Sequence, residues 1–335
     1  MQVLVTGGTG FVGSHSVHAL QSAGHRVRLL VRSRDKAEFV FGDAQPAEVT
    51  TGDVVDPRAV AAALDGVDAV VHCAAVVATQ ARRAREVLDT NLRSVELVVG
   101  GAAHRGIGRI TYISSVIALF APGAPIDEHS PLGATRSAYA KSKVDSERFV
   151  RRLQEQGASI CTLYPPGVIG PDDPGLSEGN HAIRAFLTQL MLDTATGFEV
   201  VDVRDLAAII ATSVTRGQPG RHIVSGRYLT WSELIALFDD LTGRRVRRVR
   251  IKGARLRALG RLGDRINNIV PFDFPLSREA MEYATQWPGT VRSPTLDAAG
   301  LRFRSAHDIY ADTIRWLHRA RHVTSRQAGR LASYT

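Results

Sequence analysis

Three glycines near the N-terminus constrain the fold of this chain most strongly. Gly7, Gly10 and Gly13 directly follow an apolar run over residues 3–5 and open a helical pattern over residues 11–23. Glycines between a strand and a helix let the backbone turn tightly and let a ligand approach closely. The free N–H groups at the helix N-terminus then face the negative charge of an anionic ligand. The pattern predicts a strand–turn–helix unit that holds the pyrophosphate of a dinucleotide.

Strand and helix patterns alternate through the first half of the chain. Apolar runs predict further strands over residues 27–31, 67–72, 108–113 and 159–164. Helices are predicted over residues 57–64, 82–103 and 136–156. Strands that are apolar throughout and separated by helices indicate a parallel sheet covered on both faces. We therefore predict an α/β fold, in which residues 1–165 form a Rossmann-type doubly wound parallel sheet.

The pattern changes after Pro165, where several prolines mark a loop. Helical patterns follow over residues 180–192, 203–215, 230–242 and 305–320, with a short strand over residues 221–224. This predicts a smaller, mostly helical substrate-binding lobe over residues 166–320, interleaved with the last elements of the sheet. Residues 321–335 are basic and polar, and we expect them to be a frayed tail.

Composition limits the class of protein. No apolar run in the 335 residues approaches the length of about 20 needed to span a bilayer. With no signal peptide pattern either, the expected location is the cytoplasm. Cys73 and Cys161 lie in predicted buried strands and are expected to be reduced thiols. The cysteines and histidines lack the spacing of metal ligands, so no metal is expected.

One segment is strongly basic. Residues 244–261 contain nine arginines and lysines and no acid, in a chain of net charge +9. Such a segment suits an acidic partner, including weak contact with an anionic membrane surface. No aromatic residues interleave with the arginines, so nucleic acid is not expected. The alternative is a solvated basic face without a partner.

The residues after the second predicted strand bear on the choice of cofactor. An acid at this point would accept hydrogen bonds from a ribose 2′-OH, but this chain has Arg32, Ser33 and Arg34. Guanidinium groups suit a 2′-phosphate. The sequence therefore predicts NADP(H) in preference to NAD(H), unless these arginines are merely solvated.

Other residues at the strand ends are predicted to line the cofactor. Asp53 and Val54 follow the third strand, and Asp53 either contacts the adenine amino group or caps the following helix. His72 ends the fourth strand and is expected to be a core residue rather than a catalyst. The small residues after it let the backbone lie against the cofactor: Cys73, Ala74 and Ala75.

Tyr139 and Lys143 form the predicted reacting centre. They are four residues apart, so they share one face of a helix. A nearby ammonium and an oxidised, positive nicotinamide would lower the pKa of the phenol. Tyr139 could then exchange a proton with a carbonyl or alcohol oxygen, while Lys143 also holds the nicotinamide ribose. Ser115, with Ser114 in reserve, follows a strand and could polarise that oxygen.

In this order, the motifs resemble the extended short-chain dehydrogenase/reductase superfamily, which is epimerase/dehydratase-like. The closest likeness is to its dihydroflavonol-reductase-like and 3β-hydroxysteroid-dehydrogenase-like branch. The resemblance implies a catalytic set of Ser115, Tyr139 and Lys143, and a homodimer formed through the helices at 82–103 and 136–156. It makes Asn91 a cofactor-side or proton-relay residue. It adds further cofactor contacts at Thr9, Phe11, Val12, Pro165, Pro166 and Val168.

Two departures from the family pattern bear on the substrate. Ala118, Leu119 and Phe120 stand where V-Y-G is frequent, and Tyr164 stands where an arginine often precedes the proline. Both changes make a nucleotide sugar less favoured and the lining more apolar. The substrate loops, roughly 76–88, 116–135 and 167–200, match no single subfamily.

The predicted activity is an NADP(H)-dependent oxidoreductase that interconverts a carbonyl and a secondary alcohol on a small or medium, mostly apolar substrate. One alternative is an NAD-dependent nucleotide-sugar epimerase or dehydratase, which Arg32 disfavours. Another is a non-catalytic NADP(H)-binding redox sensor, which the presence of both Tyr139 and Lys143 disfavours.

Overall fold

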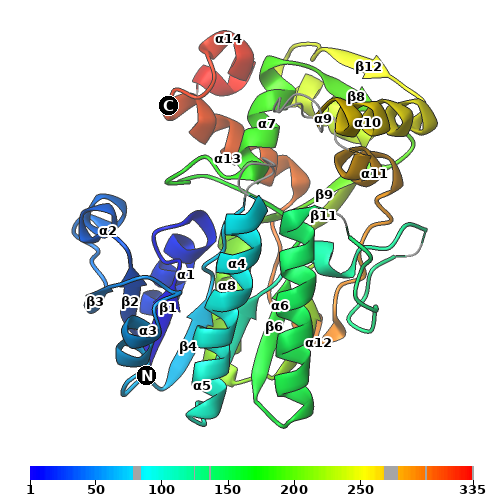
Figure 1. Cartoon of the computed structure of the whole chain (residues 1–335). Coiled ribbons are helices and arrows are strands. Elements are labelled where there is room, and N and C mark those ends of the chain that lie inside the picture. Colours follow the sequence, from blue (N-terminus) through cyan, green and yellow to red (C-terminus); the bar gives the residue numbers. More distant parts are fainter. Residues whose placement is uncertain (78–83, 124, 136, 268–277, 299, 334–335) are drawn as a thin grey trace.

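Seven parallel strands form the central sheet of the computed structural model (Figure 1), in the order β10-β6-β5-β4-β1-β2-β3. The structure describes residues 1–335 except 78–83, 124, 136, 268–277, 299 and 334–335. The strands are β1 (Gln2–Thr6), β2 (Arg26–Val31), β3 (Glu48–Thr51), β4 (Ala69–His72), β5 (Ile110–Ile113), β6 (Ile160–Tyr164) and β10 (Gly220–Ile223). The chain order reverses between β1 and β4, which places the ligand crevice of such sheets there. The predicted Rossmann-type fold is confirmed.

Both faces of this sheet are buried by helices. Val3 and Val5 of β1 face α1 and α8, where they join a core with Leu206. Leu4 faces the opposite side and joins a core with Val98. The helices of the first face are α1 (Phe11–Ser22) and α8 (Val203–Arg216). Those of the second are α3 (Pro57–Ala63), α4 (Ala84–Val95), α5 (Gly101–His104) and α6 (Ala138–Glu155). Double burial explains why the strands read as continuous apolar runs.

Some expected helix bounds differ from the structure. A π-helical segment, Glu96–Gly100, joins α4 to α5, so the predicted helix at 82–103 is interrupted. Residues 82–83 and 136, where two predicted helices begin, lie outside the described residues. The remaining short helix of the nucleotide half, α2 (Arg34–Phe41), follows β2.

The C-terminal lobe is more mixed than predicted. Its core lies between α7 (Glu178–Thr188), α9 (Trp231–Thr242) and α13 (Ala306–Arg319). Two small sheets join it: β11 (Arg227–Thr230), β9 (Gly197–Asp202) and β7 (Gly167–Ile169) form one, and β12 (Arg248–Arg250) with β8 (Met191–Asp193) forms the other. The predicted helix at 180–192 is therefore wrong at its end. The helix stops at Thr188, and Met191 is buried as part of β8.

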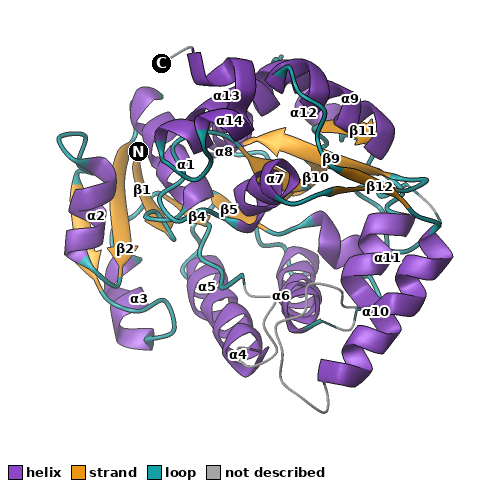
Figure 2. Ribbon diagram, turned by 90° about the horizontal axis from the view of Figure 1, so that it is seen from above, coloured by secondary structure: helices purple, strands orange, loops and turns teal. Residues whose placement is uncertain are grey.

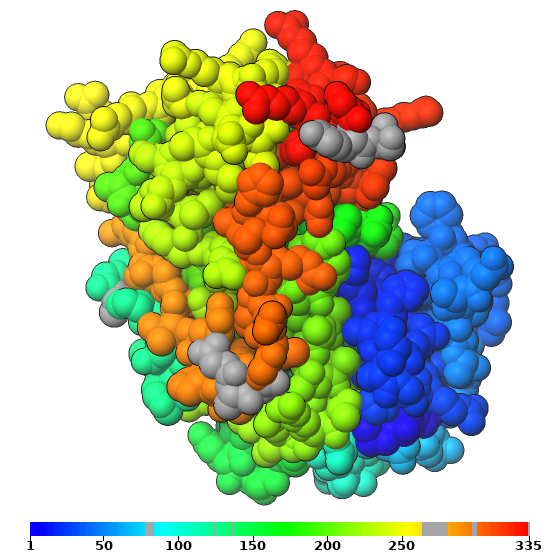
Figure 3. Space-filling model, turned by 180° about the vertical axis from the view of Figure 1, so that it is seen from behind, coloured from blue at the N-terminus to red at the C-terminus, as the bar shows by residue number. Residues whose placement is uncertain are grey.

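Two more helices stand beside each other at one side of the lobe, α10 (Gly253–Asn267) and α11 (Arg278–Gln286), as Figure 2 shows. The segment that includes α12 (Pro294–Ala298) returns along the back of the large sheet, where Leu296, Leu301 and Phe303 join the core beneath α8. It is orange in Figure 3. This return ties the lobe to the sheet.

The expectation of a frayed C-terminal tail is wrong for residues 323–333. Thr324 and Gln327 form a capping box that starts α14 (Ser325–Ala328), and a 3₁₀ turn over Gly329–Ser333 follows. Val323, Ala328 and Leu331 are buried against the lobe core. Burial of these apolar side chains holds the tail in place despite its polar composition. Within the described residues, no helix is long and apolar enough to cross a membrane.

Candidate active site

The glycine loop after β1 packs backbone against backbone. Gly7 has a φ of +70°, and a Cβ placed there would lie 2.6 Å from the Ala74 nitrogen. A Cβ on Gly13 would lie 2.1 Å from the Gly7 carbonyl oxygen. Such distances exclude any side chain. The loop therefore packs directly against the segment after β4 on one side and against the first turn of α1 on the other, as a dinucleotide cradle requires.

The N-terminus of α1 is open to an anion. Gly10 is its N-cap residue, and no side chain in the described part of the chain caps it. Its first N–H groups therefore lack a protein side-chain acceptor, and a pyrophosphate would supply one. The residues present fit the phosphates of a dinucleotide. Thr9, Phe11 and Val12 share this loop and first turn.

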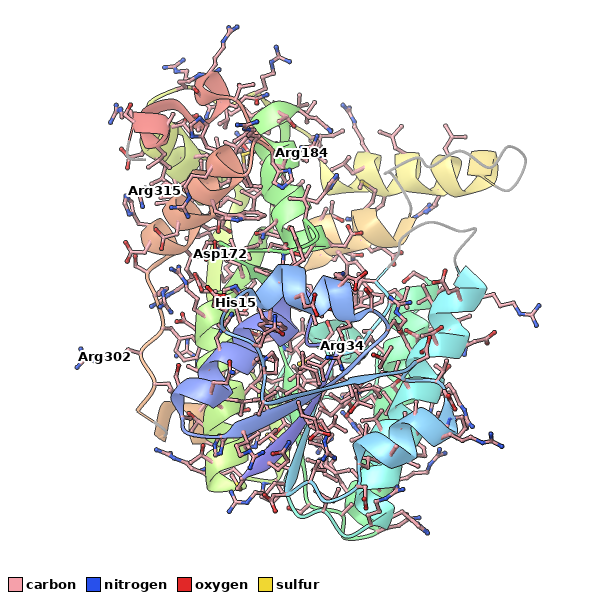
Figure 4. The ribbon with its side chains drawn as sticks, turned by 90° about the vertical axis from the view of Figure 1, so that its left-hand side faces the viewer. His15, Arg34, Asp172, Arg184, Arg302 and Arg315 are labelled. Atoms are coloured by element: carbon pink, nitrogen blue, oxygen red, sulfur yellow. The ribbon has the colours of Figure 1, made fainter. Side chains whose placement is uncertain are left out.

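The segment after β2 presents one free guanidinium. Arg34 donates from Nη2 to the Val49 carbonyl oxygen at 3.0 Å, which holds it against β3 (Figure 4). Ser33 caps α2 by accepting a hydrogen bond from the Lys36 nitrogen at 3.1 Å. Arg32, directly after β2, is exposed. Arg32 is thus accessible to a ligand at this end of the crevice, whereas the N-terminus of α2 is capped by Ser33.

The structure separates the two roles considered for Asp53. The N-cap of α3 is Asp56, whose Oδ1 accepts from the Arg58 nitrogen at 2.9 Å. Asp53 instead accepts from the Val55 nitrogen at 3.1 Å within the loop that contains Val54. Capping by Asp53 was therefore wrong. Its contact with adenine stays a prediction.

His72 is a core residue, as expected. Its Nδ1 lies 2.7 Å from the Thr6 hydroxyl, and burial, with the Lys143 charge in addition, lowers its pKa to about 3. The next residue, Cys73, is a half-buried free thiol, and burial raises its pKa to about 12. Neither group is charged near neutral pH. Among the described residues, no group of three or more potential ligands could hold a metal ion.

Asn91 fixes the segment that follows β4. Its Oδ1 accepts from the Val76 nitrogen at 2.7 Å, and its Nδ2 donates to the Val76 carbonyl oxygen at 3.0 Å. The same Nδ2 donates to the Ser142 hydroxyl at 2.9 Å. Asn91 thus holds the backbone that continues from Ala74 and Ala75 against α6. A proton-relay role stays a prediction.

Helix α6 places Tyr139 and Lys143 together, beginning at a cap in which Ser137 accepts from the Ala140 nitrogen at 3.2 Å. Lys143 is 5% exposed and donates from Nζ to the Ile113 carbonyl oxygen at 3.2 Å. Its Nζ lies 5.9 Å from the centroid of the half-buried Tyr139 ring. The buried ammonium is therefore anchored to the end of β5, with the half-buried phenol ring beside it.

Burial is the largest influence on the pKa of Tyr139. It raises the pKa of the phenol to about 12, although a hydrogen bond with Ser115 acts in the opposite direction. Burial also lowers the pKa of Lys143 to about 8. Burial, with the Glu178 charge in addition, thus raises the pKa of the phenol in the chain by itself. The lowering expected from Lys143 together with an oxidised nicotinamide stays a prediction.

The two serines after β5 point to different partners. Ser114 is buried and donates to Glu147 Oε2 at 3.1 Å. Ser115 accepts from the Ile117 nitrogen at 3.3 Å, which starts a 3₁₀ turn over Val116–Leu119, and it hydrogen-bonds Tyr139. This geometry favours Ser115 as the group that meets the substrate oxygen. The catalytic assignments themselves stay predictions.

A buried carboxylate behind the pair was not predicted. Glu147 is 0% exposed and accepts from Ser114, from the Tyr164 hydroxyl and from Arg151 Nε at 2.9 Å. Tyr139, Lys143, Glu147 and Arg151 follow one another at intervals of four, so they form one stripe along α6. This four-residue spacing is the feature of the sequence from which Glu147 could have been predicted. Tyr164 stands where related sequences often have an arginine, and it donates a hydrogen bond to Glu147 as a neutral group. Arg151 supplies the positive charge that pairs with Glu147.

The turn between β6 and β7 packs against the segment that follows β5. Pro165 accepts from the Val116 nitrogen at 3.2 Å, and Pro166 is buried beside it. Val168 is half-buried on β7. Further along, His15 of α1 lies 3.1 Å from the Pro171 carbonyl oxygen, a contact that the sequence did not indicate. Figure 4 shows Asp172 next to His15.

An aromatic cluster lies beyond Ser115. Phe120 contacts the Tyr283 ring at a centroid distance of 4.5 Å and stacks on Trp287 at 5.7 Å. Leu119 and Ile126 are buried in the same cluster. Tyr283 belongs to α11, so this wall joins the end of β5 to the C-terminal lobe.

Fold and site together define a dinucleotide-binding α/β protein with a Ser/Tyr/Lys constellation. A profile of the NAD dependent epimerase/dehydratase family matches residues 3–226, and the chain belongs to this family. The sequence resemblance is confirmed, and distant homologues include dihydroflavonol reductase and 3β-hydroxysteroid dehydrogenase. The homologues are NAD(P)-dependent oxidoreductases and epimerases.

Similar proteins cover most of the chain. Sterol demethylase protein B of Methylococcus capsulatus is 29% identical over 72% of this chain and 75% of its own length. A putative dihydroflavonol 4-reductase of Synechocystis is 28% identical over 92% of this chain and 86% of its own. The crystal structure of gox2253 has a TM-score of 0.82 and 26% identity, and the match covers 96% of this chain and 99% of that one.

Proposed function

We propose that this chain is an NADP(H)-dependent oxidoreductase that interconverts a carbonyl and a secondary alcohol on a small or medium, mostly apolar substrate. The observation that carries the proposal is that the buried ammonium of Lys143 lies 5.9 Å from the centroid of the Tyr139 ring, whose hydroxyl interacts with Ser115. A phenol that must gain or lose a proton needs a nearby positive charge and a second donor for the substrate oxygen.

Each residue has a defined task in this proposal. A bound nicotinamide supplies or accepts the hydride. In reduction, Ser115 donates a hydrogen bond to the carbonyl oxygen and Tyr139 gives it a proton; in oxidation, Tyr139 removes that proton. Lys143 stabilises the phenolate that results, and its hydrogen bond to Ile113 keeps it in place. The glycine loop holds the pyrophosphate, and Asn91 holds the backbone after β4.

The preference for NADP(H) rests on the exposed guanidinium of Arg32 at the end of β2. This guanidinium offers positive charge where a ribose 2′-phosphate would lie. Arg34 is engaged with Val49, so Arg32 is the residue proposed to read the phosphate.

The apolar character of the substrate rests on the cluster of Phe120, Tyr283 and Trp287 beyond Ser115. Aromatic walls bind ring-shaped apolar ligands well, whereas a nucleotide sugar requires charged partners for its phosphates. Two relatives carry names that refer to a sterol and to a dihydroflavonol, which agrees with this choice.

The test is a screen of ketones and aldehydes with NADPH and NADH side by side, using the wild type, Tyr139→Phe and Tyr310→Phe. Tyr310 is a buried phenol of α13, away from the site, and serves as the matched control. Tyr139→Phe should lower kcat by at least about 100-fold, with NADPH binding nearly unchanged. Wild-type turnover in Tyr139→Phe would refute the mechanism. NAD tightly bound to the purified protein would favour an epimerase instead.

A further inference from the structure

A basic face on the C-terminal lobe is not used by the proposed reaction. We define it as residues 190–192 and 244–262, which include β12, the first part of α10 and all of β8 except the half-buried Asp193. Residues 244–262 contain nine arginines and lysines and no acid, and all of these but Arg257 are exposed. In the part of the chain that the structure describes, only Asp239 forms an ion pair with them, through Arg248 at 2.9 Å. The charge of this face is therefore almost unneutralised.

The basic face also exposes apolar side chains. Val249 is 47% exposed, and its partner in the parallel register of β12 and β8 is Leu192. Leu190, directly before β8, is 43% exposed. The neighbouring helix α10 exposes Leu259 and Leu262, one turn apart. Apolar and basic groups thus share one region of the surface.

A hollow lies at one end of this face. Its lining includes the guanidinium-bearing residues Arg244, Arg245, Arg247 and Arg326, with Thr188 and Thr324 beside them. None of the described residues that line it is acidic. Several arginines around a concave site suit a phosphate group, which accepts paired hydrogen bonds from a guanidinium.

We infer that the basic face docks on the surface of an anionic lipid bilayer. Phosphates on the bilayer neutralise the arginines, the hollow receives a headgroup phosphate, and the exposed leucines and valine enter the boundary between headgroups and acyl chains. The face is free to do so, since β12 and α10 lie along the outer margin of the lobe, away from the large sheet (Figure 1). Figure 3 shows the yellow segment near residue 250 projecting at that corner.

Docking there has a consequence for the candidate site. α10 packs on α11, and Tyr283 of α11 contacts Phe120 in the aromatic cluster beyond Ser115. The docked face therefore sits one helix away from the wall proposed to bind an apolar substrate. The docking itself does not depend on the proposed reaction, because it is measured without turnover.

Other partners explain less of the face. Nucleic acid would account for the arginines, but it gives no role to Leu190, Val249, Leu259 and Leu262, and no aromatic residue lies in 244–262 to stack on bases. A second copy of this chain would bring nine positive charges against nine more.

The experiment is vesicle flotation of the full chain with phosphatidylcholine alone and with phosphatidylcholine that contains phosphatidylglycerol, at low and moderate salt. Two variants remove parts of the face: Leu259→Gln with Leu262→Gln, and Arg255→Gln with Arg261→Gln. Their matched controls are Phe39→Gln with Val291→Gln, and Arg26→Gln with Arg58→Gln, which alter exposed residues elsewhere. Circular dichroism and unfolding curves show that each variant is folded.

The wild type should float with the anionic vesicles and not with the neutral ones, and salt should weaken binding. Each arginine removed should weaken it about fivefold, and the leucine pair should weaken it about tenfold or more, with the controls unchanged. Absence of flotation at moderate salt would overturn the inference. So would equal losses in the controls, tighter binding to DNA with no effect of the leucines, or a leucine variant whose only change is loss of a dimer.

Discussion

The cofactor side of the candidate site is built from backbone, whereas its catalytic side is built from buried side chains. Around Gly7 and Gly13 the chain packs so closely that a single Cβ would collide with a carbonyl oxygen 2.1 Å away. Around Lys143 and Glu147, buried polar side chains hydrogen-bond to one another and to the backbone. The first side is sensitive to added atoms and the second to lost partners. The following substitutions test that difference.

Gly13→Ala should have the largest effect. The added methyl group collides with the Gly7 carbonyl oxygen and the Gly8 Cα, so the loop must move away from β4. We expect binding of NADPH to fall below detection in calorimetry, and the free energy of unfolding to fall by about 3 kcal/mol.

Gly108→Ala is the matched control, since a Cβ there meets nothing within 4 Å. It should bind NADPH normally. Normal binding in Gly13→Ala would show that the loop tolerates a side chain, and the cofactor side would then not be sensitive to added atoms.

Glu147→Gln should destabilise the catalytic side. The amide keeps the shape, but it removes the negative charge that Arg151 pairs with inside the protein. We expect a loss of about 2–3 kcal/mol in urea unfolding and a lower kcat, because Ser114 and the start of the Ser115 turn lose their anchor.

Asp145→Asn, on the same helix, removes a carboxylate that pairs with the exposed Lys141 and Arg148. It should cost less than about 1 kcal/mol. If the two substitutions had equal effects, burial of Glu147 would have no special importance.

Arg32→Ala tests the adenosine end of the cofactor side, where a side chain does matter. Loss of one guanidinium opposite a phosphate should raise the KM for NADPH about tenfold, or about 1.4 kcal/mol, with little change for NADH. Arg26→Ala, at the opposite end of β2, is the control. Equal changes for the two cofactors would end the assignment of NADP(H).

The smallest predicted change is the loss of a pH dependence of stability in Lys143→Met. The pKa of Lys143 is about 8 in the folded chain and 10.5 in the reference state, so between these values the unfolded chain binds more protons. The wild type should therefore gain about 1 kcal/mol relative to Lys143→Met between pH 8 and pH 9. Above pH 10 the raised pKa of Tyr139 acts in the opposite direction. Parallel curves for the two proteins would show that Lys143 is not desolvated.

The nucleotide half of the fold could be predicted because its signals are local. Residues 3–5 are apolar, residues 27–31 are apolar except for Arg28, and the glycines of the loop mark the turn, so a parallel sheet could be predicted. In the lobe, β12 consists of Arg248, Val249 and Arg250 on an exposed edge, and no hydrophobic pattern marks it. Its pairing with β8 depends on contacts far apart in the sequence. The ordered tail had a local signal, the capping box of Thr324 and Gln327, that polar composition concealed.

The candidate site shows the same limit. Tyr139 and Lys143 could be proposed from spacing on one helix. Glu147 lies on that stripe too, yet its partners Ser114 and Tyr164 come from the ends of β5 and β6. The raised pKa of Tyr139 likewise depends on burial by several elements. Only the assembled tertiary structure reveals such effects.

The position of β10 in the chain has a consequence for folding. β10 is the last strand of the large sheet along the chain, and it can pair with β6 only after β7, β9 and α8 have been synthesised. Helix α8 packs on α1 and covers the sheet core around Val3 and Leu206. A fragment of residues 1–165 would leave that core open to water and lack an edge strand. The two halves should therefore unfold as one cooperative unit, and a chain still being synthesised should complete its nucleotide-binding half only when about two thirds of its length is available.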